Sequence, residues 1–141
     1  MFGRKTYEMM SSFWPSRMAA DTYPVVAEKM NTSTKFVVSN SLKEATWQNS
    51  SILNGDIIQE IKKLKANTVE DIIILGSGSI ISLLSQSLLI DEYEFMIDPV
   101  ALSEGESLFH HIESHLKLKL VEHKVFPLSG SILLKYVPIT S

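Results

Sequence analysis

DIIILGSGSII, residues 71–81, decides the fold class of this 141-residue chain. The run Asp71–Leu75 is apolar on both faces from Ile72 onward, a pattern typical of a central parallel strand that is covered on both sides. Two glycines, Gly76 and Gly78, then lead directly into a helix that carries further isoleucines and leucines. A buried strand followed at once by a helix predicts an α/β protein.

The rest of the chain alternates between helical and extended patterns. We expect helices from Gly3 to about Trp14, late in Arg17–Met30 after a loop, over Ile57–Lys65 behind the cap Asn54-Gly55-Asp56, and from Ile80 to Leu88. We expect strands over Lys35–Ser39, Ser50–Leu53, Asp71–Leu75, Asp91–Asp98, Leu116–Phe126 with a bulge between Leu120 and Val121, and Ile132–Val137. This order predicts one three-layer α/β domain over residues 1–141, with a mixed, mostly parallel sheet, flanking helices and a C-terminal antiparallel hairpin.

The composition excludes several classes of protein. The chain has no cysteine, so disulfides, thiolate metal sites and cysteine nucleophiles are excluded. Its formal net charge of −3 and its scattered basic residues argue against a nucleic-acid-binding surface. No segment has the length of a membrane span, and the N-terminus does not resemble a signal peptide. We therefore expect a cytoplasmic protein without nucleic-acid or membrane partners.

The glycine loop is the strongest candidate for a binding site. Gly76, Ser77, Gly78 and Ser79 join the expected strand to the helix that contains Ile80. Free amides at a helix start, together with the helix dipole, favour an anion such as a pyrophosphate. The loop lacks the Gly-Lys-Ser/Thr of a Walker loop and the third glycine of a dinucleotide fingerprint. A tight strand-to-helix turn without a ligand explains the same residues equally well.

Two further segments carry polar groups at the ends of expected elements. Gly3-Arg4-Lys5-Thr6 begins a helix with two cations and a hydroxyl, which suit phosphate oxygens, although a solvated basic turn is the simpler interpretation. Ser39 and Asn40 directly follow a strand. Their small polar side chains fit a ribose or its phosphate, or serve only to cap a loop.

Other constellations predict no chemistry. Four histidines (His110, His111, His115 and His123) provide only one helical pair, His111 with His115, and no third ligand at a suitable spacing, so we expect no metal. We expect solvated carboxylates at strand ends for Asp91, Glu92 and Asp98. The sequence contains no Gly-x-Ser-x-Gly nucleophile elbow, so it does not support a hydrolase triad. Trp14 and Trp47 are expected to be packing anchors.

Several segments, taken in order, resemble one known family. They are Gly-Arg-Lys-Thr-Tyr-Glu from Gly3, Lys-Phe-Val-Val-Ser from Lys35, Trp47–Ser51, Ile72–Ser79, Leu89–Tyr93, Pro99-Val100 and Gly105–Phe109. This order resembles the dihydrofolate reductase-like superfamily, and within it the branch similar to the RibD C-terminal domain, the reductase module of riboflavin biosynthesis. The resemblance covers essentially the whole chain.

The resemblance implies an NADPH-dependent reductase. It implies cofactor binding by Gly3, Arg4, Lys5, Thr6, Ser39, Asn40, Leu75, Gly76, Ser77, Gly78, Ser79 and Ile80. In this assignment the first helix start and the glycine loop hold phosphates, Ser39 and Asn40 lie by the adenosine ribose and its 2′-phosphate, and Leu75 approaches the nicotinamide. The substrate would be a small pyrimidine- or pteridine-like heterocycle. The resemblance assigns no catalytic residue.

Two positions differ from the pattern of many relatives. Asn40 stands where relatives often have an arginine beside the 2′-phosphate, so preference for NADPH over NADH depends on Arg4 and Lys5. Ser77 stands where many relatives have the second glycine of a Gly-Gly pair.

The resemblance also implies an N-terminal strand and loop of some thirty to forty residues before the first helix. Because the chain starts at Met1, we expect an incomplete domain, with a gap or exposed edge in the sheet beside the strand that ends at Ser39. An exposed edge invites pairing with another chain, so we expect a homodimer. Dihydrofolate reductase activity and a non-catalytic nucleotide-binding role stay open as alternatives to reduction of a riboflavin precursor.

Overall fold

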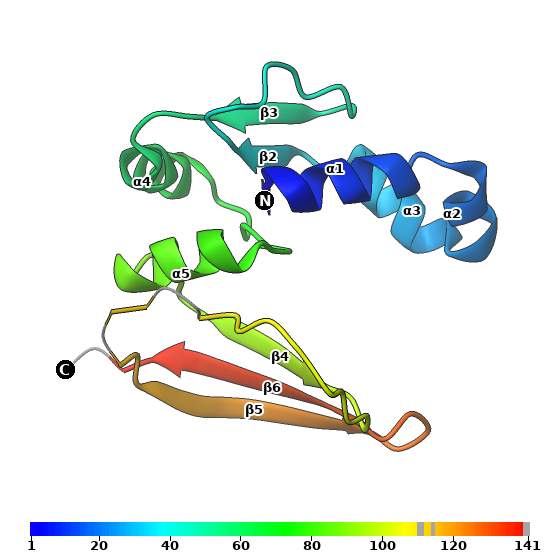
Figure 1. The fold of residues 1–141 in the computed structure, drawn as a ribbon, viewed down its shortest axis with the longest axis vertical. Coiled ribbons are helices and arrows are strands. Elements are labelled where there is room, and N and C mark those ends of the chain that lie inside the picture. Colours follow the sequence, from blue (N-terminus) through cyan, green and yellow to red (C-terminus); the bar gives the residue numbers. More distant parts are fainter. Residues whose placement is uncertain (110–111, 114, 140–141) are drawn as a thin grey trace. The chain divides into compact units, whose positions relative to one another are not determined.

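The computed structural model describes residues 1–109, 112–113 and 115–139 (Figure 1). It divides into two compact units, Met1–Ile80 and Ile81–Ser141. The first unit contains strands β1 (Phe2–Gly3), β2 (Lys35–Val38) and β3 (Ser50–Leu53), and helices α1 (Arg4–Phe13), α2 (Arg17–Thr22), α3 (Pro24–Thr32) and α4 (Ile57–Asn67). The second contains most of α5 (Gly78–Gln86) and strands β4 (Tyr93–Ile97), β5 (Leu118–Phe126) and β6 (Ser131–Pro138). The predicted combination of a parallel sheet, helices and a C-terminal antiparallel hairpin is confirmed.

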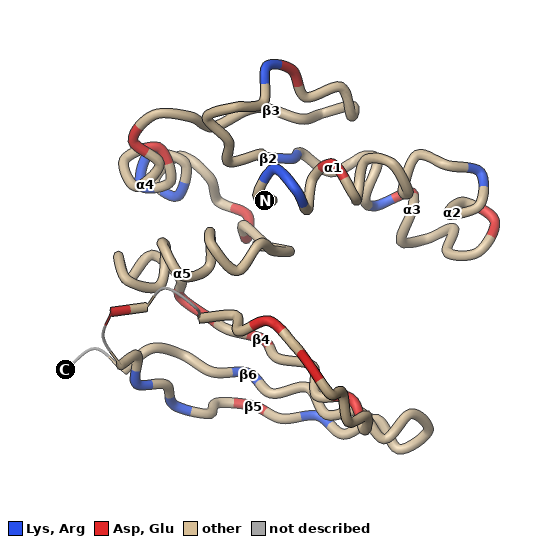
Figure 2. Tube along the Cα trace, in the orientation of Figure 1, with Lys and Arg blue, Asp and Glu red and all other residues tan. Residues whose placement is uncertain are grey.

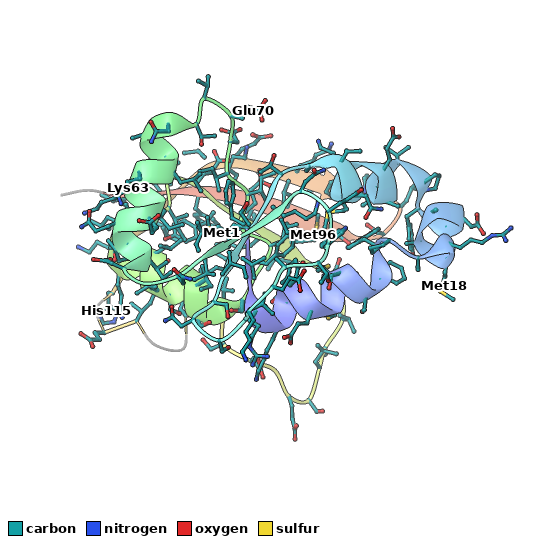
Figure 3. All side chains as sticks on the ribbon, turned by 90° about the horizontal axis from the view of Figure 1, so that it is seen from above. Met1, Met18, Lys63, Glu70, Met96 and His115 are labelled. Carbon is teal, nitrogen blue, oxygen red and sulfur yellow. The ribbon has the colours of Figure 1, made fainter. Side chains whose placement is uncertain are left out.

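Side-chain caps explain where two helices of the first unit, α2 and α4, begin. The Asp56 side chain accepts a hydrogen bond from the Gln59 N–H at 3.1 Å, which confirms the predicted cap of α4. The Ser16 hydroxyl accepts one from the Ala19 N–H at 3.2 Å and starts α2, where a loop was expected. Met18 projects outward from α2 (Figure 3). The loop prediction was wrong, because the Ser16 cap begins a short helix here.

The core of the first unit is largely aromatic. Phe2, Tyr7, Val37 and Trp47 form one buried cluster, and Trp14 packs against it, so both tryptophans are packing residues as predicted. The three ring centroids of Phe2, Tyr7 and Trp47 lie 6.1–6.5 Å from one another. The Tyr7 hydroxyl accepts a hydrogen bond from the Trp47 N–H at 2.9 Å, which satisfies both buried polar groups.

A buried lysine closes the C-terminal end of α3. The Lys35 side chain is 3% exposed, and its ammonium donates to the carbonyls of Met30, Asn31 and Ser33 at 2.6–3.1 Å. It also lies 4.6 Å from the centroid of the Trp47 ring. Burial lowers the pKa of this lysine. The cation meets the negative end of the helix dipole, so its cost of burial is offset by direct contacts.

Residues 71–75 do not form the regular buried strand that the sequence predicts. The Met1 nitrogen donates to the Ile73 carbonyl at 2.6 Å and the Leu75 N–H donates to the Met1 carbonyl at 3.1 Å, a parallel pattern. The next bond, from the Gly3 N–H, goes to Gly76 at 3.0 Å, one residue out of register. Ile73 is 63% exposed and Leu75 is 46% exposed, so the segment is not covered on both sides.

The strand that ends at Ser39 is not at an edge of its sheet. The strand order is β1-β2-β3, and β2 pairs in parallel with both neighbours. The predicted gap beside Ser39 was therefore wrong. The exposed side belongs instead to residues 72–75, since the described residues contain no backbone partner for the N–H or the carbonyl of Ile74.

The second unit contains an antiparallel sheet with the order β4-β6-β5. Its register shifts between Leu120 and Glu122, so the predicted bulge is confirmed. Tyr93 is buried, and its hydroxyl lies 2.8 Å from that of Ser85 on α5. The rings of Phe95, Phe109 and Tyr136 continue the same apolar cluster.

Candidate functional site

Parallel pairing brings two candidate segments, and the turn at Gly55, to the carboxyl edge of one sheet. Gly3 is paired with Val38, and Val38 is paired with Leu53, so these three strands end side by side. The residues that follow them are therefore neighbours: Arg4–Thr6, Ser39–Asn40 and the turn at Gly55. The glycine loop joins the row through the hydrogen bond from Gly3 to Gly76. The carboxyl edge of a parallel sheet is where α/β proteins bind their ligands.

Gly3 and Gly76 are positions where backbones and neighbouring side chains approach closely. A Cβ on Gly3 would stand 2.5 Å from Ser77 Oγ and 3.4 Å from Ile80 Cγ1. Gly76 has φ +109°, and a Cβ there would stand 3.4 Å from Thr6 Oγ1. The Gly76–Ser77 peptide bond is cis. The glycine loop and the start of α1 thus form one packed surface.

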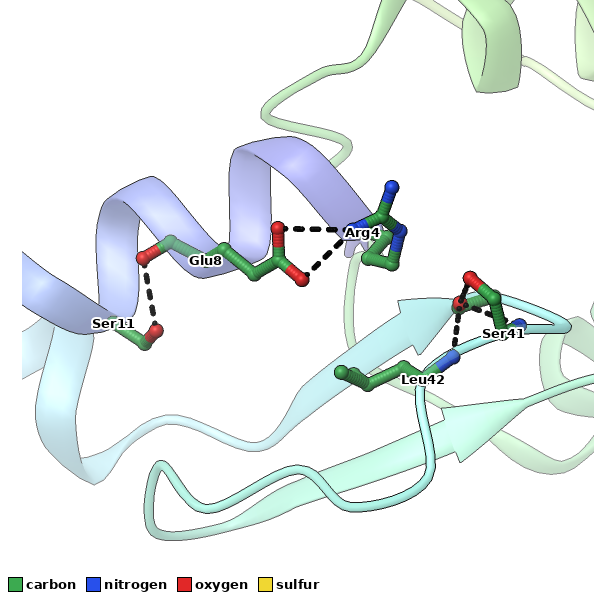
Figure 4. A network of polar contacts seen from close by, with 6 residues as sticks. Arg4, Glu8, Ser11, Ser41 and Leu42 are labelled. Carbon is green, nitrogen blue, oxygen red and sulfur yellow. Dashed lines mark hydrogen bonds and ion pairs between the residues drawn. The ribbon is translucent and has the colours of Figure 1, made fainter.

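The start of α1 leaves its first amides without a side-chain cap. Its N-cap is Gly3, which has no side chain to accept a bond, and the first turn contains no acidic residue. The N–H groups of Arg4, Lys5 and Thr6 therefore have no helical acceptor. Arg4 is 42% exposed and donates to both carboxylate oxygens of Glu8 at 3.0 and 3.2 Å (Figure 4). The guanidinium is held beside the helix start, with part of its charge balanced by Glu8.

Ser39 and Asn40 build the neighbouring turn. The buried Ser39 hydroxyl accepts hydrogen bonds from the N–H groups of Ser41 at 3.2 Å and Leu42 at 2.9 Å (Figure 4). Asn40 Oδ1 accepts one from the Gly55 N–H at 3.1 Å. Ser39 therefore caps its own loop, which is one of the two roles predicted for it from the sequence. The Asn40 amide group keeps its two N–H donors, and the residue itself is exposed.

The other side of the site is the start of α5. Helix α5 begins at Gly78, and the hydroxyls of Ser77 and Ser79 lie 2.8 Å apart on the surface. Ile80 is 7% exposed, so its side chain packs beneath the loop, while Leu75 is about half exposed. Of the twelve predicted cofactor-binding residues, eleven lie in the adjoining segments Gly3–Thr6, Ser39–Asn40 and Gly76–Ile80. The twelfth, Leu75, directly precedes the glycine loop.

The sequence patterns did not predict a cavity of about 470 Å³ elsewhere in the first unit. Its lining residues are Ser11, Pro15, Asn31, Thr46, Trp47 and Gln48. Asn31 donates to the Trp14 carbonyl at 2.9 Å and accepts from Trp47 Nε1 at 2.7 Å. These residues come from three separate stretches of the chain and meet only through folding, so no local pattern predicts the cavity. None of the twelve predicted cofactor residues lines this cavity.

Two other predictions concern metals and membranes. His110 and His111 lie outside the described residues. Across residues 1–109, 112–113 and 115–139, no group of three histidine or acidic side chains is arranged to hold a metal ion. Within the same ranges, no helix is both long enough and apolar enough to cross a membrane.

Comparisons with known proteins assign the family. The model of the RibD C-terminal domain family matches residues 1–129. The uncharacterized protein YyaP of Bacillus subtilis (strain 168) is 30% identical over 136 residues, which are 96% of this chain and 71% of YyaP.

Solved structures share the fold. A candidate riboflavin biosynthesis protein from Shewanella sp. PV-4 has a TM-score of 0.76 at 24% identity, over 99% of this chain and 72% of that protein. Acinetobacter baumannii RibD has a TM-score of 0.56 at 19% identity, over 74% of this chain and 31% of RibD. The chain belongs to the RibD C-terminal domain family and has its dihydrofolate reductase-like fold.

Proposed function

We propose that this chain is an NADPH-dependent reductase domain that transfers hydride to a pyrimidine- or pteridine-like heterocycle, as in reduction of the riboflavin precursor 5-amino-6-(5-phosphoribosylamino)uracil. Membership of the RibD C-terminal domain family supports a reductase. The observation that carries the proposal is the hydrogen bond between Gly3 and Gly76, because it joins two phosphate-binding candidates from distant parts of the sequence.

The geometry fits a dinucleotide. Gly3 and Gly76 let the glycine loop pack directly against the start of α1. The uncapped amides of α1 suit phosphate oxygens. Arg4 and Lys5 would hold phosphates, and Ser77 and Ser79 would offer hydroxyl donors beside them. The amide of Asn40 would face the adenosine ribose. The bound nicotinamide would supply the hydride, and the protein would position it.

The substrate assignment rests on the family and on the names of the similar proteins. The Shewanella protein is described as a candidate riboflavin biosynthesis protein, and the Acinetobacter protein as RibD. None of the twelve cofactor candidates is an aspartate, glutamate or histidine, the usual proton donors. Because the resemblance assigns no catalytic residue, the second candidate is a relative that binds the nucleotide without reducing a substrate. Dihydrofolate reductase activity is the third.

Titration with NADPH tests the cofactor site. We expect quenching of tryptophan fluorescence and a rise in the melting temperature, with a dissociation constant about tenfold higher for Arg4→Ala because a charge-assisted contact is lost. Arg17→Ala is the matched control, since Arg17 also begins a helix and pairs with an acid four residues on. Equal binding by both variants, or no response to millimolar NADPH, would contradict the site.

Loss of nicotinamide absorbance then separates the three functions. Oxidation of NADPH with the ribosylaminopyrimidine alone supports the first function, and oxidation with dihydrofolate alone supports the dihydrofolate reductase. Binding without oxidation by either substrate identifies a nucleotide-binding relative. The cytoplasmic location expected from the sequence stays a prediction.

A further inference from the structure

One asparagine of this chain lies in a setting that favours a chemical change of its own side chain. Asn54 is followed by Gly55, whereas the other four asparagines are each followed by serine or threonine. Asn54 and Gly55 are both exposed, in the short turn between β3 and α4. A Cβ on Gly55 would meet no atom within 4 Å, so neither a side chain of its own nor a neighbouring group obstructs this turn.

The side chain of Asn54 is also unrestrained. Within residues 1–109, 112–113 and 115–139 it has no hydrogen-bond partner, whereas every other asparagine side chain has one. These partners are the Trp14 carbonyl for Asn31, the Gly55 N–H for Asn40, the Thr32 carbonyl for Asn49 and the Lys63 carbonyl for Asn67. The amide of Asn54 can therefore rotate until its Cγ meets the next backbone nitrogen.

We propose that Asn54 is a site of spontaneous deamidation, in which the Gly55 nitrogen attacks Asn54 Cγ. Hydroxide removes the proton of the Gly55 N–H, the N–Cγ bond forms, and the Cγ–Nδ2 bond breaks. The Nδ2 group takes a proton from water and leaves as ammonia, so a cyclic imide remains. A water molecule then opens the imide at either carbonyl and gives aspartate or isoaspartate. Water replaces ammonia without oxidation or reduction, and the side chain gains one negative charge.

Asn40 restrains this reaction. Its Oδ1 accepts a hydrogen bond at 3.1 Å from the Gly55 N–H, which carries the attacking nitrogen. A hydrogen bond donated by the neutral N–H disfavours its deprotonated form. The same bond holds the N–H toward Asn40. Because the bond is exposed and joins two turns that are 15 residues apart, the rate of deamidation depends on how often it opens.

The product places a negative charge beside the candidate cofactor segments, and this consequence rests on the proposed function. Asp56 is the only charged residue of the three between β3 and α4 (Figure 2). A carboxylate at position 54 adds a second acid next to the turn of Asn40, which would face the adenosine ribose. Like charges repel at short distance, so deamidation weakens binding of the 2′-phosphate of NADPH.

Incubation of the full chain in mildly alkaline buffer tests the reaction. Peptide mass mapping follows conversion of Asn54, and enzymatic methylation of isoaspartate measures the isoaspartyl product. Asn54→Gln should abolish the conversion, because its longer side chain would have to close a larger ring. Equal acid formation in Asn54→Gln and the parent, or conversion only at another asparagine, would overturn the site.

Two substitutions at Asn40 test the restraint. Asn40→Ala removes the acceptor and should speed conversion of Asn54 about fivefold, the worth of a typical hydrogen bond. Asn40→Asp keeps an acceptor oxygen and should convert about as slowly as the parent. Asn67→Ala is the control, since the Asn67 amide is bonded to the Lys63 carbonyl and not to this turn. Equal rates for Asn40→Ala and Asn67→Ala would overturn the role of Asn40.

Titration of Asn54→Asp with NADPH measures the consequence separately. We expect a dissociation constant several-fold above that of the parent, with a smaller difference at high salt. Asn67→Asp adds the same charge at the last residue of α4 and should bind like the parent. Equal binding by Asn54→Asp and Asn67→Asp would overturn the consequence. A parent that does not bind NADPH contradicts the proposed function instead, and the mass mapping still decides whether Asn54 deamidates.

Discussion

The hydroxyl of Ser77 lies across Gly3, only 2.5 Å from the point where a Cβ on Gly3 would stand. The same hydroxyl is hydrogen-bonded to Ser79 at 2.8 Å. Gly3 and Ser77 are 74 positions apart in the sequence, yet their close approach joins the glycine loop to the start of α1. The candidate site depends on this contact, because it brings both helix starts to one edge of the sheet.

Gly3→Ala should therefore destabilise the first unit. The new methyl group must displace Ser77 Oγ and press on Ser77 Cβ at 3.3 Å, a strain that costs about 1–2 kcal/mol of unfolding free energy. Urea unfolding measures the loss. Adding Ser77→Gly removes the obstructing side chain and should recover most of the stability. A Gly3→Ala chain as stable as the parent would show that the loop moves freely.

Asn40→Arg should strengthen binding of NADPH relative to NADH. If the proposed cofactor orientation is right, an arginine at this exposed position gains a charge-assisted contact to the 2′-phosphate, worth about tenfold in the dissociation constant. Titrations with both cofactors measure the ratio. Asn67→Arg, on the exposed end of α4, is the control for added charge. An unchanged ratio would place the adenosine ribose elsewhere.

Lys35→Met should destabilise the chain strongly. The substitution keeps most of the apolar stem but leaves the carbonyls of Met30, Asn31 and Ser33 without their donor, at an expected cost of about 2–4 kcal/mol. Lys29→Met, an exposed position on α3, should change the unfolding free energy by less than about 0.5 kcal/mol. Similar losses in chemical denaturation for the two variants would argue against the role of the buried ammonium.

Tyr93→Phe should cost about 1 kcal/mol, because Ser85 would lose its partner in a buried position. Tyr136→Phe is the matched control in the same aromatic cluster.

The pH dependence of this pair of variants is a separate prediction. Burial raises the pKa of Tyr93 above its usual value of 10.0. The folded chain therefore keeps this proton where the unfolded chain loses it, and the stabilising contribution is complete below pH 10 and declines above it. The parent should lose stability more steeply than Tyr93→Phe above pH 10, in unfolding curves measured at several pH values. Parallel pH profiles would contradict a buried, neutral tyrosine.

Much of the local structure follows from local sequence patterns. The cap at Asp56, the strand Ser50–Leu53 and the bulge after Leu120 are all confirmed. The prediction of a regular buried strand at Asp71–Leu75 was wrong, because an apolar composition indicates burial but does not specify the register of strand pairing. Its pairing slips by one residue at Gly76, where the chain turns toward Gly3. The sheet edge was misplaced for a related reason, since two residues, Phe2 and Gly3, pair with Val37 and Val38 at the end of β2.

The sequence by itself determined the family, because seven segments match it in order. It also determined most of the helices and strands and the three polar segments at element ends, because propensity, capping and glycine placement act over a few residues. Only the tertiary structure decided that Gly3 meets Gly76 and Ser77, that the Ser39 hydroxyl is used by its own turn, and that Lys35 is buried against Trp47. These relationships join residues whose backbone and side chains meet through strand register and close packing, which no local pattern encodes.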